Sequence, residues 1–290
     1  MWGQHTCLMD NELAIAARGL RKAYGKNVAV AGVDLEVRRG EVFALLGPNG
    51  AGKTTTVEIL EGYRRRDAGE VSVLGSDPTA PAANWRNRIG IVLQGVGEFD
   101  ELNVSELVHH FAGFYADADD PEKVIARVGL AGKARARTHT LSGGQKRRLD
   151  VALGIIGRPE LLFLDEPTTG FDPEARREFW QLIRDLAAAG TTIVLTTHYL
   201  DEAEALADRV GVIAGGRLIE VAAPEHLGNR QQAHATVSWR TPEGRSESTE
   251  SATPTELVTE LAARFGGEVP GLTVTRPTLE DVYLRMIGHR

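Results

Sequence analysis

The chain has little cysteine and no long apolar run. Cys7 is the single cysteine among 290 residues, so no internal disulfide bond can form and a reducing compartment is expected. No segment approaches the roughly 18 to 20 uninterrupted apolar residues of a membrane-spanning helix. The first residues also lack the basic start and the apolar stretch of a signal peptide. These absences predict a cytoplasmic chain that reaches a membrane only by docking onto another protein.

Aromatic side chains and positive charge are also scarce. Aromatic residues make up 6% of the chain, and 40 acidic residues outnumber 33 basic ones, which gives a net charge of −7. An acidic chain does not offer the broad basic surface that holds nucleic acid, so no nucleic-acid partner is expected. With 42% hydrophobic and 25% charged residues, the composition is that of a globular protein long enough for about two domains.

A glycine-rich loop at residues 47–54 stands between an apolar run, 41–46, and a helical pattern, 55–60. Strand, loop and helix in this order are the context that the pattern G-x-x-x-x-G-K-[ST] requires. The glycines let backbone N–H groups turn toward phosphate oxygens, and the following helix points its positive end at them. Lys53 adds a charge for the β- and γ-phosphates, and Thr54 adds a hydroxyl for Mg²⁺. The loop therefore predicts a nucleotide-binding site.

A second anion site is predicted at residues 141–145, Leu-Ser-Gly-Gly-Gln, which open a further helix. A hydroxyl and free N–H groups at a helix start point in one direction and suit an anion. Alone, the same sequence is also a common helix cap. The basic residues 146–148 and the pair Arg135 and Arg137 are interpreted as solvated or phosphate-adjacent charges.

Polar groups also follow several buried strands. Asp165 and Glu166 end the apolar run 161–164, at the strand edge where α/β proteins bind ligands. Asp165 can hold Mg²⁺, directly or through water, and Glu166 can polarise an attacking water as general base. Gln94 and His198 each come just after a buried strand, within reach of the same edge. Taken singly, each of these groups could be a plain strand-end cap.

Hydrophobic periodicity divides the chain into domains. Strands are predicted at 13–17, 28–30, 33–37, 69–75, 89–93, 161–164, 192–196, 210–213 and 217–220, with a turn at 21–25. Helices are predicted at 104–115, 120–128, 173–188 and 201–207. Because the middle is helical while its flanks are strands, we expect a helical subdomain at about 95–155, inserted into a domain that spans 13–226. Residues 1–12 read as a loose extension.

A small α/β accessory domain is predicted at residues 227–290. Its segment 241–248 is polar and rich in turn residues. A capping box at 253–256 starts a helix, a strand follows at 272–275, and residues 278–281 cap a final helix.

The motifs together resemble the ATP-binding subunit of an ATP-binding-cassette (ABC) transporter, over about residues 13–225. The phosphate loop, Gln94, Leu-Ser-Gly-Gly-Gln, Asp165-Glu166 and His198 occur in that family's order. The resemblance implies an α/β fold, a P-loop NTPase ABC cassette with a mixed sheet core, an antiparallel β subdomain and an inserted helical subdomain. The small C-terminal α/β appendage is additional.

The resemblance also implies roles for individual residues, with ATP and Mg²⁺ as ligands. Tyr24 stacks on adenine, and the phosphates are held by Gly47, Pro48, Asn49, Gly50, Ala51, Gly52, Lys53, Thr54 and Thr55. Glu166, His198 and Gln94 are catalytic, and Mg²⁺ is held by Thr54, Gln94 and Asp165. The ATP of the opposite subunit is clamped by Leu141, Ser142, Gly143, Gly144 and Gln145, while Asp172 lies in a loop at the dimer interface. Two copies facing head to tail complete each other's site.

The tail at 276–284 resembles the daunorubicin-resistance type of exporter ATPase, a type-2 ABC exporter family. That resemblance implies a homodimer on the inner face of the cell membrane, docked on a separately encoded transmembrane permease. Docking is expected at about 95–114, where Phe99, Leu102, Phe111 and Phe114 supply apolar contacts. The expected cargo is a drug, a lipid or another hydrophobic compound.

Three alternatives remain open: an importer ATPase, a soluble ABC ATPase acting on ribosomes or DNA, and a module that binds ATP without hydrolysing it. The single phosphate loop and the absence of a long heptad run argue against the second. Glu166 and His198 argue against the third.

Overall fold

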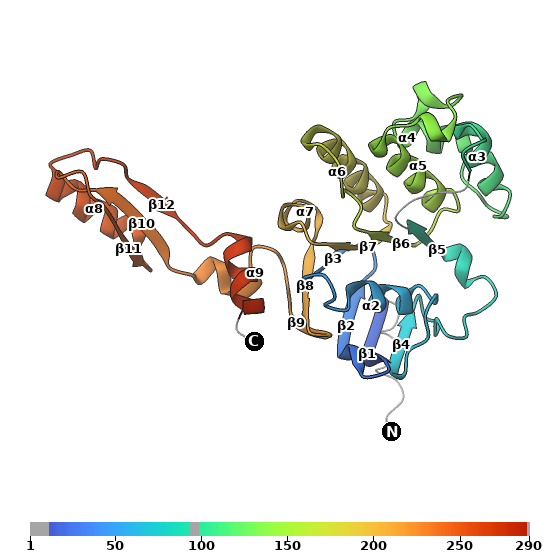
Figure 1. The fold of residues 1–290 in the computed structure, drawn as a ribbon, viewed down its shortest axis with the longest axis horizontal. Coiled ribbons are helices and arrows are strands. Elements are labelled where there is room, and N and C mark those ends of the chain that lie inside the picture. Colours follow the sequence, from blue (N-terminus) through green and yellow to red (C-terminus); the bar gives the residue numbers. More distant parts are fainter. Residues whose placement is uncertain (1–11, 93–98, 289–290) are drawn as a thin grey trace. The chain divides into compact units, whose positions relative to one another are not determined.

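The computed structural model describes residues 12–92 and 99–288, and it divides the chain into two compact units. The first ends at Val221 and the second begins at Ala222 (Figure 1). The elements of the first unit are β1 Leu13–Tyr24, β2 Asn27–Arg38, β3 Val42–Leu46, α2 Lys53–Leu60, β4 Ala68–Val73, the 3₁₀ helix η1 Trp85–Arg88, β5 Ile89–Val92, α3 Val104–Ala112, α4 Pro121–Arg127, η2 Ala131–Lys133, η3 Thr138–Thr140, α5 Gly143–Ile155, β6 Leu161–Asp165, α6 Pro173–Ala188, β7 Thr192–Thr197, α7 Leu200–Leu206, β8 Arg209–Ala214 and β9 Arg217–Ala222.

The centre of the first unit is a six-stranded sheet in the order β5-β6-β7-β3-β8-β9. The pairs β5–β6, β6–β7, β7–β3 and β3–β8 are parallel. Helices α3 to α7 lie on one side of this sheet, and α2 lies on the other (Figure 1). Because both faces are covered, β3 is buried along its whole length, as its continuous apolar sequence predicts.

A second sheet, in the order β2-β1-β4, is antiparallel and packs with α2. The predicted turn at 21–25 is wrong in extent, because β1 continues to Tyr24 and pairs with β2 and β4 on its two sides. The two short strands predicted at 28–30 and 33–37 are likewise one strand, β2. Register shifts next to Gly19 let β1 keep pairing, and the Gly19 N–H donates to Asp34 Oδ1 at 2.6 Å.

The helical part of the first unit consists of α3, α4 and α5 with η2 and η3 between them. Asn103 and Glu106 form a capping box at the start of α3, and Asp120 caps α4 with Pro121 at the first helical position. In the part of the chain that is described, no helix is both long enough and apolar enough to cross a membrane.

The second unit contains η4 Leu227–Gln232, β10 Ala235–Arg240, β11 Ser246–Ser251, α8 Pro254–Phe265, β12 Thr273–Thr275 and α9 Leu279–Gly288. Its sheet has the order β11-β10-β12, with α8 packed on β10 around Val237, Trp239, Leu261 and Val269. The predicted polar, turn-rich segment 241–248 ends in a strand, β11. That strand is almost fully exposed and is fixed by backbone pairing with β10 rather than by burial, so no hydrophobic pattern marks it.

Helix caps in the second unit follow the sequence in one case and not in the other. At α9 the Asp281 N–H donates to Thr278 Oγ1 at 3.1 Å and the Thr278 N–H donates to Asp281 Oδ2 at 2.8 Å, so the predicted cap at 278–281 is present and is reciprocal. At α8 the predicted capping box is wrong, because the Thr253 side chain caps nothing. The Thr253 N–H is instead taken by Ser251 Oγ at 3.1 Å, so Glu256 has no donor to reach back to.

The second unit also begins earlier than the predicted boundary at 226/227. Leu227 is fully buried, and a Cβ at Gly228 would lie 2.3 Å from Val282, so η4 packs tightly on α9. The Arg230 Nε–H donates to the Pro277 carbonyl at 2.9 Å and closes the same contact. The segment from Leu227 onward therefore packs with the C-terminal elements, and the division of the chain into compact units adds residues 222–226 to them.

Because each unit has its own hydrophobic core, a substitution that creates a cavity in one core should destabilise that unit alone. Leu261→Ala removes a buried side chain from the second core and should cost that unit about 2–5 kcal/mol. Hydrogen–deuterium exchange should accelerate in β10 and α8 but not in β3 or β7. The control is Leu284→Ala in the same unit, whose side chain is 52% exposed and should have little effect. Faster exchange in β3 would contradict the separation of the two cores.

Candidate functional site

The loop between β3 and α2 is built on glycines that no other residue replaces. A Cβ at Gly47 would lie 2.3 Å from the Ile213 carbonyl oxygen, and one at Gly52 would lie 2.3 Å from the Ala29 carbonyl oxygen. Gly52 also has φ 105°, in the left-handed region, where it forms the cap residue of α2. The loop therefore lies with its backbone directly against β2 and β8.

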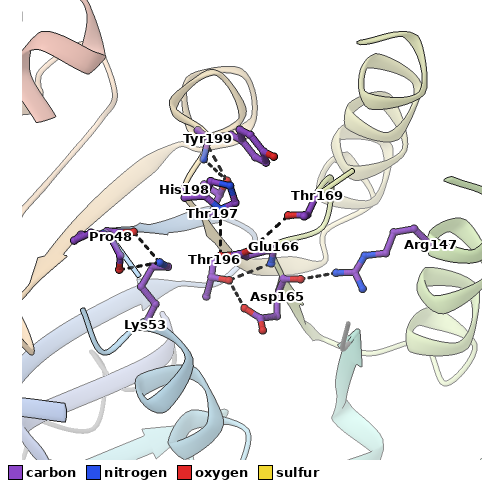
Figure 2. Close-up of polar contacts among 11 residues, drawn as sticks. Pro48, Lys53, Arg147, Asp165, Glu166, Thr169, Thr196, Thr197, His198 and Tyr199 are labelled. Carbon is purple, nitrogen blue, oxygen red and sulfur yellow. Dashed lines mark hydrogen bonds and ion pairs between the residues drawn. The ribbon is translucent and has the colours of Figure 1, made fainter. Parts of the chain in front are cut away.

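Lys53 is held at the centre of this loop. Its side chain is buried, and Nζ donates to the Gly47 carbonyl at 2.7 Å and to the Pro48 carbonyl at 3.2 Å (Figure 2). Burial lowers the pKa of the ammonium, while the charges of Glu166 and Asp165 raise it. An anion bound to the loop would compete with the two carbonyls for this ammonium.

A cavity of about 250 Å³ opens over the loop. It is lined by Tyr24, Asn27, Ala29, Asn49, Gly50, Gly52, Lys53, Thr54, Thr55 and Glu166. Tyr24 is 41% exposed at the end of β1, so it is not a core residue. Lys22 Nζ lies 5.6 Å and the Arg64 guanidinium 5.3 Å from the centre of its ring. Of the predicted phosphate-loop residues, Ala51 is buried, and the carbonyls of Gly47 and Pro48 accept hydrogen bonds from Lys53.

The two predicted carboxylates both lie at the end of β6, which β7 connects to β3, the strand before the loop. In the sheet register Asp165 of β6 is paired with Thr196 of β7, and Thr197 is paired with Leu46, which precedes the loop. The Thr196 hydroxyl donates to Asp165 Oδ1, and the Glu166 N–H donates to both the carbonyl and the hydroxyl oxygen of Thr196, each at 3.1 Å (Figure 2). Parallel pairing thus brings the two carboxylates to the loop.

Glu166 has a strained backbone and faces His198. Its φ of 44° lies in the left-handed region, which is unusual for a residue with a side chain and occurs most often at functional sites. Glu166 Oε1 lies 3.2 Å from His198 Nδ1, and Thr169 Oγ1 donates to Glu166 Oε2 at 3.4 Å (Figure 2). The His198 ring also lies against Tyr199, with 4.1 Å between ring centres.

Arg147 is a residue whose place the sequence did not indicate. It is buried, so its interpretation as a solvated charge is wrong. Its Nη2 donates to the Asp165 carbonyl at 2.6 Å (Figure 2). Its Nε donates to the Pro167 carbonyl at 3.2 Å, so Arg147 holds the backbone on both sides of Glu166. Its position beside the exposed Lys146 concealed this role, because α5 turns the two side chains to different faces.

The remaining predicted residues cap helices. Ser142 and Gln145 form a capping box at the start of α5: the Gln145 N–H donates to Ser142 Oγ at 3.3 Å, and the Ser142 N–H donates to Gln145 Oε1 at 3.1 Å. Ser142 and Gly143 are exposed, and Leu141 is buried. Asp172 caps α6, and Oδ1 accepts from the N–H groups of Glu174 and Ala175. Among the described residues that line the cavity over the loop, none comes from 141–145. Gln94 lies outside the described residues.

The donor chemistry near the loop fits Mg²⁺. Thr54, which carries a hydroxyl, lines the cavity, and Asp165 carries a carboxylate at the end of β6, on the far side of β7 from β3. Oxygen donors of this kind are the ligands Mg²⁺ prefers, usually one or two from the protein with the rest from phosphates and water. The described residues contain no group of three or more His, Cys, Asp or Glu that could bind a metal by itself.

Comparison with known proteins identifies the family of the chain. The family model described as ABC transporter matches residues 30–169. The chain is 38% identical to the daunorubicin resistance ATP-binding protein DrrA3 of Streptomyces coeruleorubidus, over 96% of both chains. It is also 38% identical to the Nod factor export ATP-binding protein I of Burkholderia orbicola, over 93% of this chain and 96% of that protein.

A solved structure agrees with these relatives. The cbiO1 protein from Clostridium perfringens, part of the ABC transporter complex cbiONQ, has a TM-score of 0.68 at 28% identity, over 76% of this chain and 92% of that one. The predicted cassette fold, with its mixed central sheet and antiparallel subdomain, is thereby confirmed. The chain belongs to the ABC transporter ATP-binding proteins and is the ATPase subunit of an exporter of the DrrA and Nod factor export type.

Proposed function

We propose that the chain hydrolyses ATP with Mg²⁺ at a site shared between two copies, and that it drives export through a separate transmembrane permease. The observation that carries this proposal is the convergence of Lys53, Asp165, Glu166 and His198 on the loop between β3 and α2. These are the groups that phosphoryl transfer to water requires: a phosphate-binding cation, a metal-binding carboxylate and a base.

Each residue has a role that follows from its position. The loop N–H groups and Lys53 bind the phosphates, and the exposed ring of Tyr24 stacks on adenine. Thr54 and Asp165, with Gln94, hold Mg²⁺, which when bound neutralises charge on the β- and γ-phosphates. Glu166 accepts a proton from the attacking water, and His198, 3.2 Å away, orients the water and the γ-phosphate.

The second anion site supports a head-to-tail homodimer. The start of α5 is exposed at Ser142 and Gly143, and it does not line the cavity over the chain's own phosphate loop. In the proposed dimer these N–H groups and the Ser142 hydroxyl bind the γ-phosphate held by the partner, with Asp172 at the interface. ATP then holds two copies together, and hydrolysis separates them.

The permease is proposed to dock in a groove on the first unit. This groove, of about 420 Å³, is lined by Glu61, Gly62, Tyr63, Arg86, Ile89, Gly90, Ile91, Phe111, Tyr115, Leu153 and Gly154. Phe99 and Phe114 extend it, because each packs edge-on against Phe111 with ring centres 5.8 Å apart. Docking there places the chain on the inner face of the membrane. The names of the two relatives suggest a drug-like or lipid-like cargo.

Capture of the partner tests this proposal. Tagged Glu166→Gln protein is incubated with detergent-solubilised native membranes, ATP and Mg²⁺. A stoichiometric polytopic membrane protein in the eluate supports the exporter, and its identity begins the search for the cargo. A soluble dimer alone, or ribosomal proteins in its place, would move the chain to the soluble ATPases.

Glu166→Gln should reduce turnover by about 10²- to 10⁴-fold, because the amide cannot accept the proton of the attacking water. ATP affinity should be unchanged, and ATP should produce dimers that persist in size-exclusion chromatography with light scattering. The control is Glu174→Gln, which changes an exposed carboxylate on α6 and should leave turnover unaffected. Normal turnover in the Glu166 variant would remove this residue as the base.

Arg147→Lys should lower kcat by at least about tenfold with little change in ATP affinity. A lysine cannot reach the carbonyls of both Asp165 and Pro167, so the backbone around Glu166 loses a hydrogen bond that fixes its position. The neighbouring Arg148→Lys is the control, since Arg148 pairs with exposed Glu178 on α6. Equal effects of the two substitutions would speak against a positioning role for Arg147.

A further inference from the structure

Glu61 is a buried acid that nothing in the described part of the chain neutralises. It directly follows α2, is 7% exposed and lines the groove proposed for the permease. None of the described residues forms a hydrogen bond or an ion pair with its carboxyl. The carboxyl lines the groove and has no partner within the described chain, so a cationic group from outside can reach it and compensate the cost of burying its charge.

The surroundings of Glu61 all disfavour its negative charge. Burial raises the pKa of Glu61 to about 7, and the charges of Asp165 and Glu58 act in the same direction. Glu61 also occupies the C-terminal end of α2, where the helix dipole is negative, and the last turn of α2 contains no basic residue. A cation placed here would therefore be stabilised by every one of these charges.

The groove around Glu61 limits what such a cation can be attached to. Ile91, Phe111 and Leu153 supply apolar walls, from β5, α3 and α5. Arg86 lines the same groove but is exposed and makes no ion pair with Glu61. An acidic group between apolar walls fits a lysine or arginine side chain on the apolar face of a short helix. The aliphatic part of that side chain would pack against the walls, and its charged end would reach Glu61.

We propose that Glu61 receives a lysine or arginine side chain from the docking segment of the membrane partner. This inference rests on the proposed function, because it takes the occupant of the groove to be the permease. Neutralising Glu61 also removes a negative charge that acts on Asp165, the proposed Mg²⁺ ligand. Docking of the partner would thereby be felt electrostatically at the nucleotide site.

Charge reversal tests the inference in the full chain. In the Glu166→Gln background with ATP and Mg²⁺, Glu61→Lys should bind at least about tenfold less of the membrane protein that the unaltered groove captures. Glu61→Gln should bind severalfold less. Glu70→Lys makes the same change at an exposed acid of β4 and should bind normally. Changing the matching basic residue of the captured protein to Glu should restore binding to Glu61→Lys.

Each outcome decides one claim. If Glu61→Lys binds as well as Glu70→Lys, or if no basic residue of the captured protein restores binding when reversed, the role of Glu61 is overturned. If the unaltered groove captures no membrane protein, the proposed function itself fails.

Stability measurements show that lost binding is not lost folding. The pKa of Glu61 is raised on folding, so its ionisation destabilises the fold as pH rises from about 4.5 to about 7. The melting temperature of Glu61→Gln should therefore exceed that of the unaltered chain at pH 8, and the difference should vanish near pH 4. A lower melting temperature at pH 8 would mean that the carboxylate has a partner within the fold.

Discussion

Thr196 fastens the end of β6 to the end of β7, and the geometry of the site depends on that connection. The Thr196 hydroxyl donates to Asp165, and both the hydroxyl oxygen and the carbonyl oxygen of Thr196 accept from the Glu166 N–H. The carboxylates are thus fixed by a neighbouring strand rather than by a flexible loop. Since β7 also pairs with β3, the strand that leads into the glycine-rich loop, three consecutive parallel strands set the distances between the loop, Asp165 and Glu166.

The same connection maintains strain at Glu166. A left-handed φ at a glutamate costs of order 1–3 kcal/mol and persists only where its surroundings enforce it. Here Thr196 holds one side, and Arg147 holds the carbonyls of Asp165 and Pro167 on the other. Arg147 comes from α5, the helix whose first residues are proposed to bind the partner's nucleotide. One helix would therefore link that proposed site to Glu166 of its own chain.

Helix α2 links the nucleotide loop to the groove in a similar way. Lys53 is its first residue and Glu61 follows its last, so Glu61 lies eight positions, about 12 Å of helix, after Lys53. Both side chains are buried, both have shifted pKa values, and both respond to the charge of Asp165. A short rigid helix between two buried ionisable groups gives the two sites a direct electrostatic connection in addition to any movement of subdomains.

The sequence by itself determined the cassette fold and the chemical identity of the site. Loop, strand-end carboxylates and helix caps depend on local residue type, and glycine, aspartate and serine signal their backbone roles within a few residues. It also determined the limits of most central strands, since those strands are buried on both faces and read as apolar runs.

Only the tertiary structure decided the rest. The continuous β1, the polar edge strand β11 and the association of η4 with α9 depend on pairing between distant segments, which leaves no periodic pattern. Arg147 and Glu61 look like ordinary surface charges in the sequence, because burial is a property of the assembled fold. The surroundings of these two charged side chains in the fold, and not their residue types, distinguish them from the exposed charges nearby.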